Sequence, residues 1–89
     1  MASYKLTARR SFEKALGKFP KNVTAAIIDR VRGLTDNPFG PNTKKLTGSA
    51  SLYRLRVGDY RVIYMVDSKG KVIVLLHVGH RKDVYRQSL

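Results

Sequence analysis

Three arginines flank a predicted hairpin turn, and they are the residues whose type and spacing first suggest chemistry. A two-residue turn at Gly58-Asp59 pairs Arg56 directly with Arg61 across two antiparallel strands. Arg54 lies two residues before Arg56 and therefore shares its face of the sheet. Like charges that face each other destabilise a sheet, so we interpret the trio as a site for an anion. Guanidinium groups bind phosphate oxygens in bidentate pairs, which makes phosphate the expected ligand.

The C-terminal sequence GHRKDVYRQSL carries further groups of the same kind after the last predicted strand. If that strand ends beside the three arginines, Arg81 adds a guanidinium and Tyr85 adds a phenol. The tail then forms the second wall of a phosphate site. A structural alternative stays open, in which the arginines are exposed strand residues partnered by Asp59 or Asp67.

The composition of the chain indicates a polyanionic partner. Its 89 residues include 18 Lys and Arg against 6 Asp and Glu, which gives a formal net charge of +12 and a pI of about 10.5. Such a charge attracts polyanions, so we expect contact with RNA or the ribosome. The sequence has no cysteine and no apolar run of the length that a signal peptide or membrane span needs. We therefore expect a cytoplasmic protein that binds no membrane, metal or cofactor, folded as one domain over residues 1–89.

Apolar periodicity predicts a short strand followed by two helices. Side chains alternate from Ser3 to Thr7, which is typical of a strand, and Thr7 is expected to cap the first helix. Apolar stripes of helical period then predict helices over residues 8–19 and 23–34. Because few residues separate them, the two helices should form an antiparallel hairpin.

The second half of the chain changes to the period of β-strands. Residues 38–51 are rich in Gly, Pro, Ser, Thr and Asn, and are predicted to form a loop. Three strands of an antiparallel meander follow, at Leu52 to Val57, Tyr60 to Val66 and Lys71 to Val78. The last is apolar on both alternations, which favours a central place, and His77 within it is predicted to be a hydrogen-bonded core residue. The order β-α-α-β-β-β predicts an α+β fold with a helical hairpin on a small antiparallel sheet.

The segments LYRLRVGDYRVIYMV and VGHRKDVYR resemble the RelE branch of the RelE/ParE toxin superfamily, and the resemblance covers nearly the whole chain. It implies a microbial-ribonuclease-like fold and a toxin of a type II toxin-antitoxin system, neutralised by a RelB-like antitoxin. It also implies metal-independent cleavage of messenger RNA in the ribosomal decoding site. ParE-like members share the fold but inhibit DNA gyrase, so a gyrase inhibitor or an inactive binding module is the alternative.

The resemblance also implies roles for individual residues. The family's basic pair corresponds to Arg54 and Arg56, although well-studied ribosome-dependent members carry lysines there. Its transition-state arginine corresponds to Arg61, its arginine after the last strand to Arg81, and its tyrosine near the C-terminus to Tyr85. Four further cations are expected to bind RNA or the ribosome: Lys44, Lys45, Lys82 and Arg86.

Proton transfer is the step that these residues leave open. Arginine keeps its proton at ordinary pH and makes a poor general base. His80 could donate or accept a proton near neutral pH, Tyr85 could donate one or ionise among the cations, or ribosomal RNA could orient the 2′-hydroxyl. We favour the ribosome, assisted by Tyr85 and Arg81, and keep His80 as a further candidate.

Overall fold

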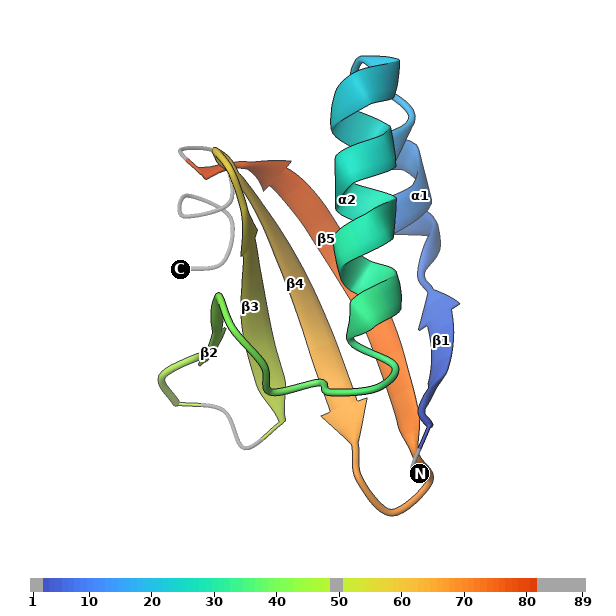
Figure 1. Cartoon of the computed structure of the whole chain (residues 1–89), viewed down its shortest axis with the longest axis vertical. Helices are drawn as coiled ribbons and strands as arrows, with labels where there is room; N and C mark the ends of the chain where they lie inside the picture. Colours follow the sequence, from blue (N-terminus) through green and yellow to red (C-terminus); the bar gives the residue numbers. More distant parts are fainter. Residues whose placement is uncertain (1–2, 49–50, 82–89) are drawn as a thin grey trace.

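A five-stranded sheet with two helices on one face makes up the described part of the chain, residues 3–48 and 51–81 of a computed structural model (Figure 1). The elements in chain order are β1 (Lys5–Ala8), α1 (Arg10–Leu16), α2 (Lys21–Gly33), β2 (Thr43–Lys45), β3 (Leu52–Val57), β4 (Tyr60–Asp67) and β5 (Val72–His80). The strand order across the sheet is β1-β5-β4-β3-β2, and only β1 and β5 pair in parallel. The predicted α+β class is confirmed.

The hairpin of β3 and β4 has the register that its turn residues predict. Gly58 adopts a φ of 58°, in the left-handed region that favours glycine, and this conformation closes the two-residue turn. Arg56 pairs with Arg61, and Arg54 pairs with Ile63. Because side chains alternate along each strand, this register divides the hairpin residues between the two faces of the sheet.

The longest strand, β5, lies inside the sheet between β1 and β4, as its apolar sequence predicts. Its parallel partner β1 extends to Ala8, which lies opposite Leu75. The prediction that Thr7 caps the first helix is therefore wrong: Thr7 is a strand residue, and α1 begins after Arg9. Alternation identified the strand but not its end, because pairing with a strand distant in the sequence extends it.

A β-bulge interrupts β5 near its middle. Two consecutive residues of β4 pair with Leu75 and His77, which leaves Leu76 as the extra residue. The hydroxyl of Ser11 in α1 donates a 2.5 Å hydrogen bond to the Leu76 carbonyl and so holds the bulge. One extra residue exchanges the faces to which the following side chains belong. Side chains after Leu76 therefore lie on the face opposite to the one that unbroken alternation from Leu75 would give them.

The segment predicted as a loop, residues 38–51, contains a short strand that the sequence did not indicate. β2 pairs antiparallel with β3, with Lys44 opposite Arg54 and Lys45 opposite Tyr53. The strand has three residues and no buried side chain, so it carries no apolar pattern. Its pairing gives hydrogen-bond partners to the outer backbone groups of β3.

The core lies between the helices and one face of the sheet. Phe12, Ile27 and Val31 are its buried residues in α1 and α2. The sheet contributes residues that are at most 3% exposed: Leu55, Val62, Tyr64, Ile73, Leu75 and Val78. Neither described helix is long and apolar enough to cross a membrane. The helices thus cover one face, and the site must be sought on the other.

Candidate phosphate-binding site

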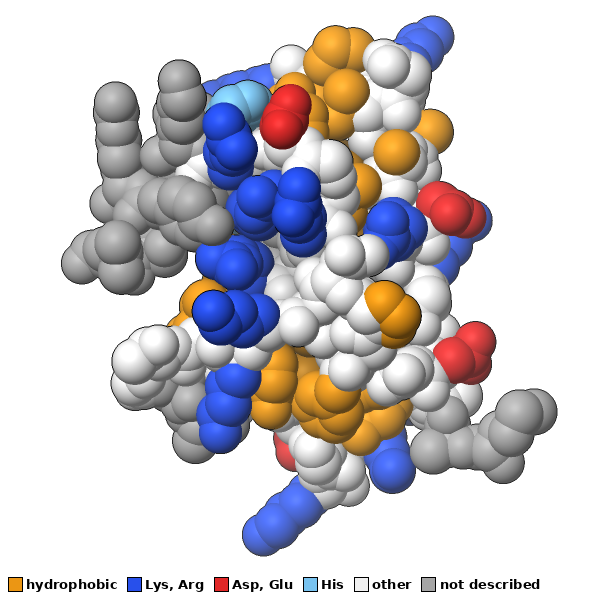
Figure 2. Space-filling view, turned by 60° about the vertical axis from the view of Figure 1, so that its left-hand side comes forward, with side chains coloured by type: hydrophobic (Ala, Val, Ile, Leu, Met, Phe, Trp, Pro, Cys, Tyr) orange, Lys and Arg blue, Asp and Glu red, His pale blue; other side chains and the backbone are white. Residues whose placement is uncertain are grey.

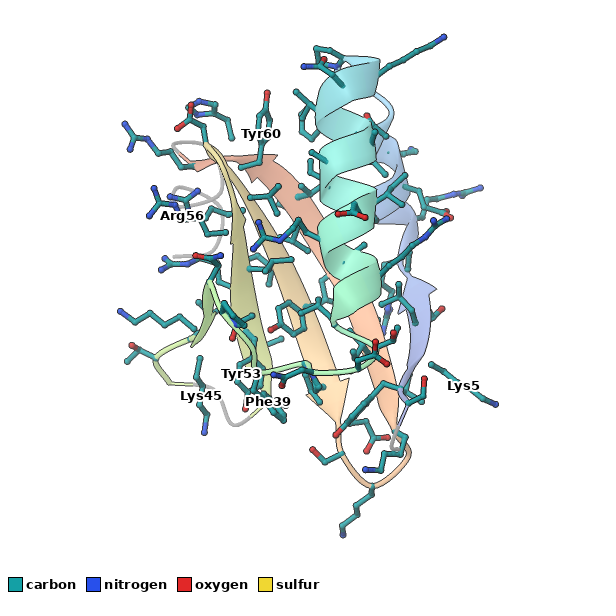
Figure 3. The ribbon with its side chains drawn as sticks, in the orientation of Figure 1. Lys5, Phe39, Lys45, Tyr53, Arg56 and Tyr60 are labelled. Carbon is teal, nitrogen blue, oxygen red and sulfur yellow. The ribbon has the colours of Figure 1, made fainter. Side chains whose placement is uncertain are left out.

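Four cations lie in two adjacent rows on the face of the sheet opposite the helices. Lys44 and Arg54 are cross-strand partners in one row, and Arg56 and Arg61 are partners in the next. Cross-strand partners share a face, with their Cβ atoms about 4.5–5.5 Å apart. We call these four residues the basic face. Figure 2 shows Lys and Arg side chains gathered in one band, and Figure 3 shows Arg56 pointing away from the helices.

Arg61 is the buried member of the basic face, with 6% of its surface exposed. Its Nη1 donates hydrogen bonds to the carbonyl oxygens of Gly58 (2.9 Å) and Tyr60 (3.0 Å). Its Nε is buried and, among the described residues, has no hydrogen-bond partner. A buried charge that meets only neutral carbonyls is uncompensated, and an unpaired buried N–H carries its full desolvation cost. Arg61 is therefore fixed in direction and still able to bind an anion.

The alternative of internal ion pairs is not seen for Arg56 or Arg61. Within residues 3–48 and 51–81, neither arginine pairs with Asp59 or Asp67. Asp67 instead accepts a 3.1 Å hydrogen bond from the backbone N–H of Gly70 in the next turn. Two guanidinium groups therefore face each other, and no carboxylate of the described residues pairs with either, which favours an external anion.

Arg81 follows β5 at the end of the sheet that carries Arg56 and Arg61. Its backbone N–H donates a 2.7 Å hydrogen bond to the carbonyl of Asp59 in the hairpin turn. Gly79, two residues earlier, pairs with Arg61 and adds no side chain to the basic face. The exposed side chain of Arg81 thus begins close to the basic face. Three residues with predicted roles lie outside the described residues: Lys82, Tyr85 and Arg86.

The bulge in β5 determines which faces of the sheet carry His77 and His80. His80 pairs with Tyr60, a residue packed against the core, and the two rings meet edge-on at 5.7 Å. His77 is half-buried and pairs with Ile63, in the row of Arg54. His80 therefore lies on the face of the helices, and His77 lies on the face of the arginines.

The prediction of a core position for His77 is wrong for this physical reason. Unbroken alternation would place His77 on the core side with Leu75, but the extra residue gives that side to Val78. His77 is also the titratable neighbour of the arginines that sequence reasoning missed. The sequence signal was its position two residues before Gly79. Residues two apart share a face of a strand, and Gly79 pairs with Arg61.

The two lysines of the predicted loop take opposite sides of β2. Lys44 joins the basic face as the partner of Arg54, whereas Lys45 is the partner of Tyr53 and shares its side of the sheet. As loop residues they were expected to be equivalent, but as strand neighbours they alternate. Cations therefore line both sides of this edge of the sheet.

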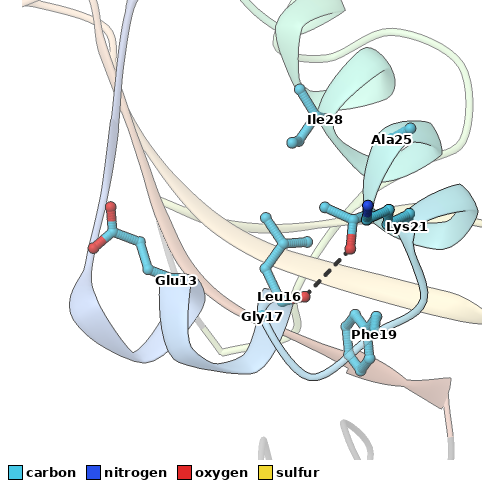
Figure 4. Close-up of a pocket in the computed structure, with 8 residues that line it drawn as sticks. Glu13, Leu16, Gly17, Phe19, Lys21, Ala25 and Ile28 are labelled. Carbon is cyan, nitrogen blue, oxygen red and sulfur yellow. Dashed lines mark hydrogen bonds between the residues drawn. The ribbon is translucent and has the colours of Figure 1, made fainter.

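An open cleft of about 520 Å³ lies on the other side of the molecule, between the two helices (Figure 4). Leu16, Phe19, Ala25 and Ile28 are among the side chains that line it. Thr24 donates a 3.3 Å hydrogen bond to the Leu16 carbonyl and links the helices there. The cleft is built only from the helices and their connection, so it is separate from the basic face. In the described ranges, no group of three or more His, Cys, Asp or Glu residues is placed to hold a metal ion.

Comparison with known proteins identifies the family that shares this arrangement. The family model described as the ParE toxin of the type II toxin-antitoxin system parDE matches residues 3–85. The chain belongs to the RelE/ParE toxin superfamily. Toxin RelG of Mycobacterium tuberculosis is 35% identical to this RelE-like toxin over 85 residues, which cover 91% of this chain and 90% of RelG.

Solved structures confirm the RelE-like fold of this toxin. A chain of the archaeal RelE-RelB complex from Pyrococcus horikoshii matches with a TM-score of 0.78 and 35% identity, covering 89% of this chain and 96% of that one. The toxin-antitoxin complex RelBE2 from Mycobacterium tuberculosis matches with a TM-score of 0.81 and 29% identity, covering 91% and 94%. The chain is thus a RelE-like toxin of a type II toxin-antitoxin system.

Proposed function

We propose that this toxin is a metal-independent endoribonuclease that cleaves messenger RNA in the ribosomal decoding site and thereby inhibits translation. The observation that carries the proposal is Arg61, a guanidinium 6% exposed, held by two carbonyls, with a buried Nε that has no partner. The exposed Arg56 faces it across the hairpin. Together they offer a phosphate one fixed and one adaptable cationic donor.

The proposed reaction develops negative charge where the basic face has donors. The ribose 2′-oxygen attacks the adjacent phosphorus, the bond from phosphorus to the 5′-oxygen breaks, and a 2′,3′-cyclic phosphate and a 5′-hydroxyl result. The crowded phosphorane between these states carries more charge on its free oxygens than the starting phosphodiester. Donors that are fixed before the reaction stabilise this state more than the ground state, which lowers the barrier.

The two proton transfers need other groups. The 2′-hydroxyl must lose a proton and the 5′-oxygen must gain one, and arginine does neither readily. His80 lies on the helix side with Tyr60, so its position gives no support to a direct role. We propose that ribosomal RNA orients the 2′-hydroxyl, with Tyr85 and Arg81 assisting. The isolated toxin should therefore bind free RNA with a steep salt dependence but hardly cut it.

We further propose that a RelB-like antitoxin neutralises this toxin. Chains similar to it occur in RelE-RelB complexes, and its charge of +12 favours an acidic partner. The cleft lined by Leu16, Phe19 and Ile28 offers apolar surface for an amphipathic helix. Because the cleft and the basic face lie on opposite sides of the sheet, an antitoxin that covers both must pass around an edge of the sheet.

A gyrase-inhibiting toxin is the second candidate, because the matching family model carries the ParE description. In that case the basic face would bind the toxin's target without catalysing a reaction.

A translation extract separates the two functions. The endoribonuclease should yield messenger fragments with new ends inside the reading frame, and addition of the antitoxin should abolish them. Accumulation of gyrase-DNA adducts without such fragments would contradict the proposal. Rapid turnover of free RNA by the pure toxin would contradict the requirement for the ribosome.

A further inference from the structure

An aromatic pair, the exposed Phe39 and the half-buried Tyr53, lies beside the basic edge of the sheet, and the proposed reaction does not use it. Phe39 is 48% exposed, the highest value for a large hydrophobic side chain in the described ranges. Its ring packs on the ring of Tyr53, with centroids 5.1 Å apart. Tyr53 in turn stacks on the fully buried Tyr64, with centroids 5.8 Å apart and an interplanar angle of 25°. Three rings thus lead from the core to the surface.

The segment that carries Phe39 is held in place by hydrogen bonds. The hydroxyl of Tyr64 donates a buried 2.6 Å bond to the carbonyl of Pro38. The backbone N–H of Phe39 donates a 3.2 Å bond to Oδ1 of Asn37. A ring presented on a fixed backbone loses little conformational entropy when a partner packs on it. The hydrogen-bonded backbone of this turn therefore keeps the Phe39 ring exposed.

Cations connect this aromatic pair with the basic face. Lys45 is the strand partner of Tyr53, and Lys44, the preceding residue, is the partner of Arg54 on the basic face. Figure 3 shows Lys45, Tyr53 and Phe39 near one another at this edge, and Figure 2 shows an apolar patch next to the band of cations. A strand of RNA that leaves the basic face around β2 would meet Lys45 and then the exposed ring.

We propose that Phe39, backed by Tyr53, is a stacking platform for an unpaired base of RNA whose phosphates lie along Lys44 and Lys45. This inference rests on the proposed function for the identity of the polyanion. Every base has a π-face, so an aromatic ring among cations binds single strands with little sequence preference. A purely apolar protein contact would not need lysines on both sides of the same edge. The base can belong to a messenger or to ribosomal RNA, since the stacking chemistry is the same.

A single tryptophan tests the platform directly. The chain contains no tryptophan, so Phe39→Trp places one indole at the platform, and a stacked base should quench its fluorescence. The probe is a single-stranded hexamer with 2′-O-methyl riboses, which cannot be cleaved, and its control is the same backbone without bases. The hexamer with bases, or ribosomes with an empty decoding site, should quench the indole. Quenching by the hexamer assigns a messenger base, and quenching by ribosomes alone assigns a ribosomal one.

Two outcomes overturn the proposal. One is an indole that neither RNA probe quenches, or that the base-free backbone quenches equally. The other is quenching by the antitoxin alone, which would make Phe39 a protein contact.

Affinity measurements on the natural ring give a matched comparison. Phe39→Ala and Phe39→Leu should both weaken binding of the hexamer about 5- to 150-fold, because leucine keeps apolar volume but has no π-face. Neither variant should change the salt dependence. Lys45→Ala should instead reduce the salt slope by about one phosphate contact. Retained affinity in Phe39→Leu would contradict stacking. None of these measurements depends on cleavage, so loss of the proposed enzymatic function and loss of the platform are distinguishable.

Discussion

The two faces of the sheet are made from the same strands, yet they differ in what their residues do. On β3, Leu55 is 2% exposed and packs in the core, whereas the next residue, Arg56, is exposed and faces Arg61. Burial of an apolar side chain stabilises the fold by about 1.5–3 kcal/mol, whereas like charges that face each other destabilise it. One hairpin register therefore sets both the burial of the core residues and the position of the cations.

The largest expected effect on stability separates these two neighbours. Leu55→Ala should lower the free energy of unfolding by about 2–5 kcal/mol, because it leaves a cavity in the core. Arg56→Ala should change it by no more than about 0.5 kcal/mol, or raise it, because it relieves repulsion by Arg61. Urea unfolding of both variants measures the difference. An equal loss in Arg56→Ala would mean that the basic face also stabilises the fold.

The two faces also differ at alkaline pH, because the core side of the sheet carries a titratable group, Tyr64. Burial raises the pKa of Tyr64 from 10.0 to about 12, against the opposing effect of its hydrogen bond with Thr43. Between pH 10 and 12 the unfolded chain loses a proton that the folded chain keeps, so stability falls as the pH rises. The full loss is about 3 kcal/mol, since one pKa unit corresponds to about 1.4 kcal/mol.

Tyr64→Phe is the matched variant for this pH dependence. It should lose about 0.5–1.5 kcal/mol at neutral pH with the hydrogen bond to Pro38, and should show a shallower decline above pH 10. Urea unfolding at pH 9 measures the loss of the hydrogen bond, and the further change at pH 11 measures the pH dependence. Parallel declines in the two proteins would show that Tyr64 does not titrate as its burial requires.

The two histidines, which lie on opposite faces of the sheet, give the smallest expected effect. His77→Ala should weaken RNA binding at most a few-fold, because it removes a hydrogen-bonding imidazole from the face of the arginines. His80→Gln should leave cleavage and its pH profile nearly unchanged, because His80 lies with Tyr60 on the other face. Single-turnover cleavage between pH 5 and 8 checks the second statement. Loss of one limb of the profile in His80→Gln would return His80 to proton transfer.

Local rules were sufficient for the hairpin and insufficient for its neighbours. The turn at Gly58-Asp59 and strict alternation determine which residues of β3 and β4 share a face. β2 could not be predicted, because its three residues are ordered by pairing with β3 and not by an apolar pattern. The bulge at Leu76 accepts a hydrogen bond from Ser11, 65 residues earlier. No local sequence pattern in β5 predicts the bulge.

The sequence predicted which arginines share a face but not how deeply each is buried. Arg56 and Arg61 have equivalent places in the pattern, yet the first is exposed and the second is 6% exposed with an unpaired Nε. That asymmetry depends on the carbonyls of Gly58 and Tyr60, which the folded turn directs at Nη1. It is a property of tertiary geometry, and it supports the proposal that Arg61 stabilises the transition state.

Single-turnover cleavage on saturated ribosomes tests this assignment most directly. Arg61→Ala should lower the rate constant by a factor of about 10² to 10³, while affinity for the ribosome falls far less. Arg61→Lys, which keeps the charge but not the fork, should recover only part of the rate. Lys45→Ala is the control, since Lys45 lies on the other side of the sheet and its loss should weaken binding and reduce the salt slope by about one without changing the rate at saturation. A loss of ribosome binding that explains the whole loss of rate in Arg61→Ala would contradict transition-state stabilisation by Arg61.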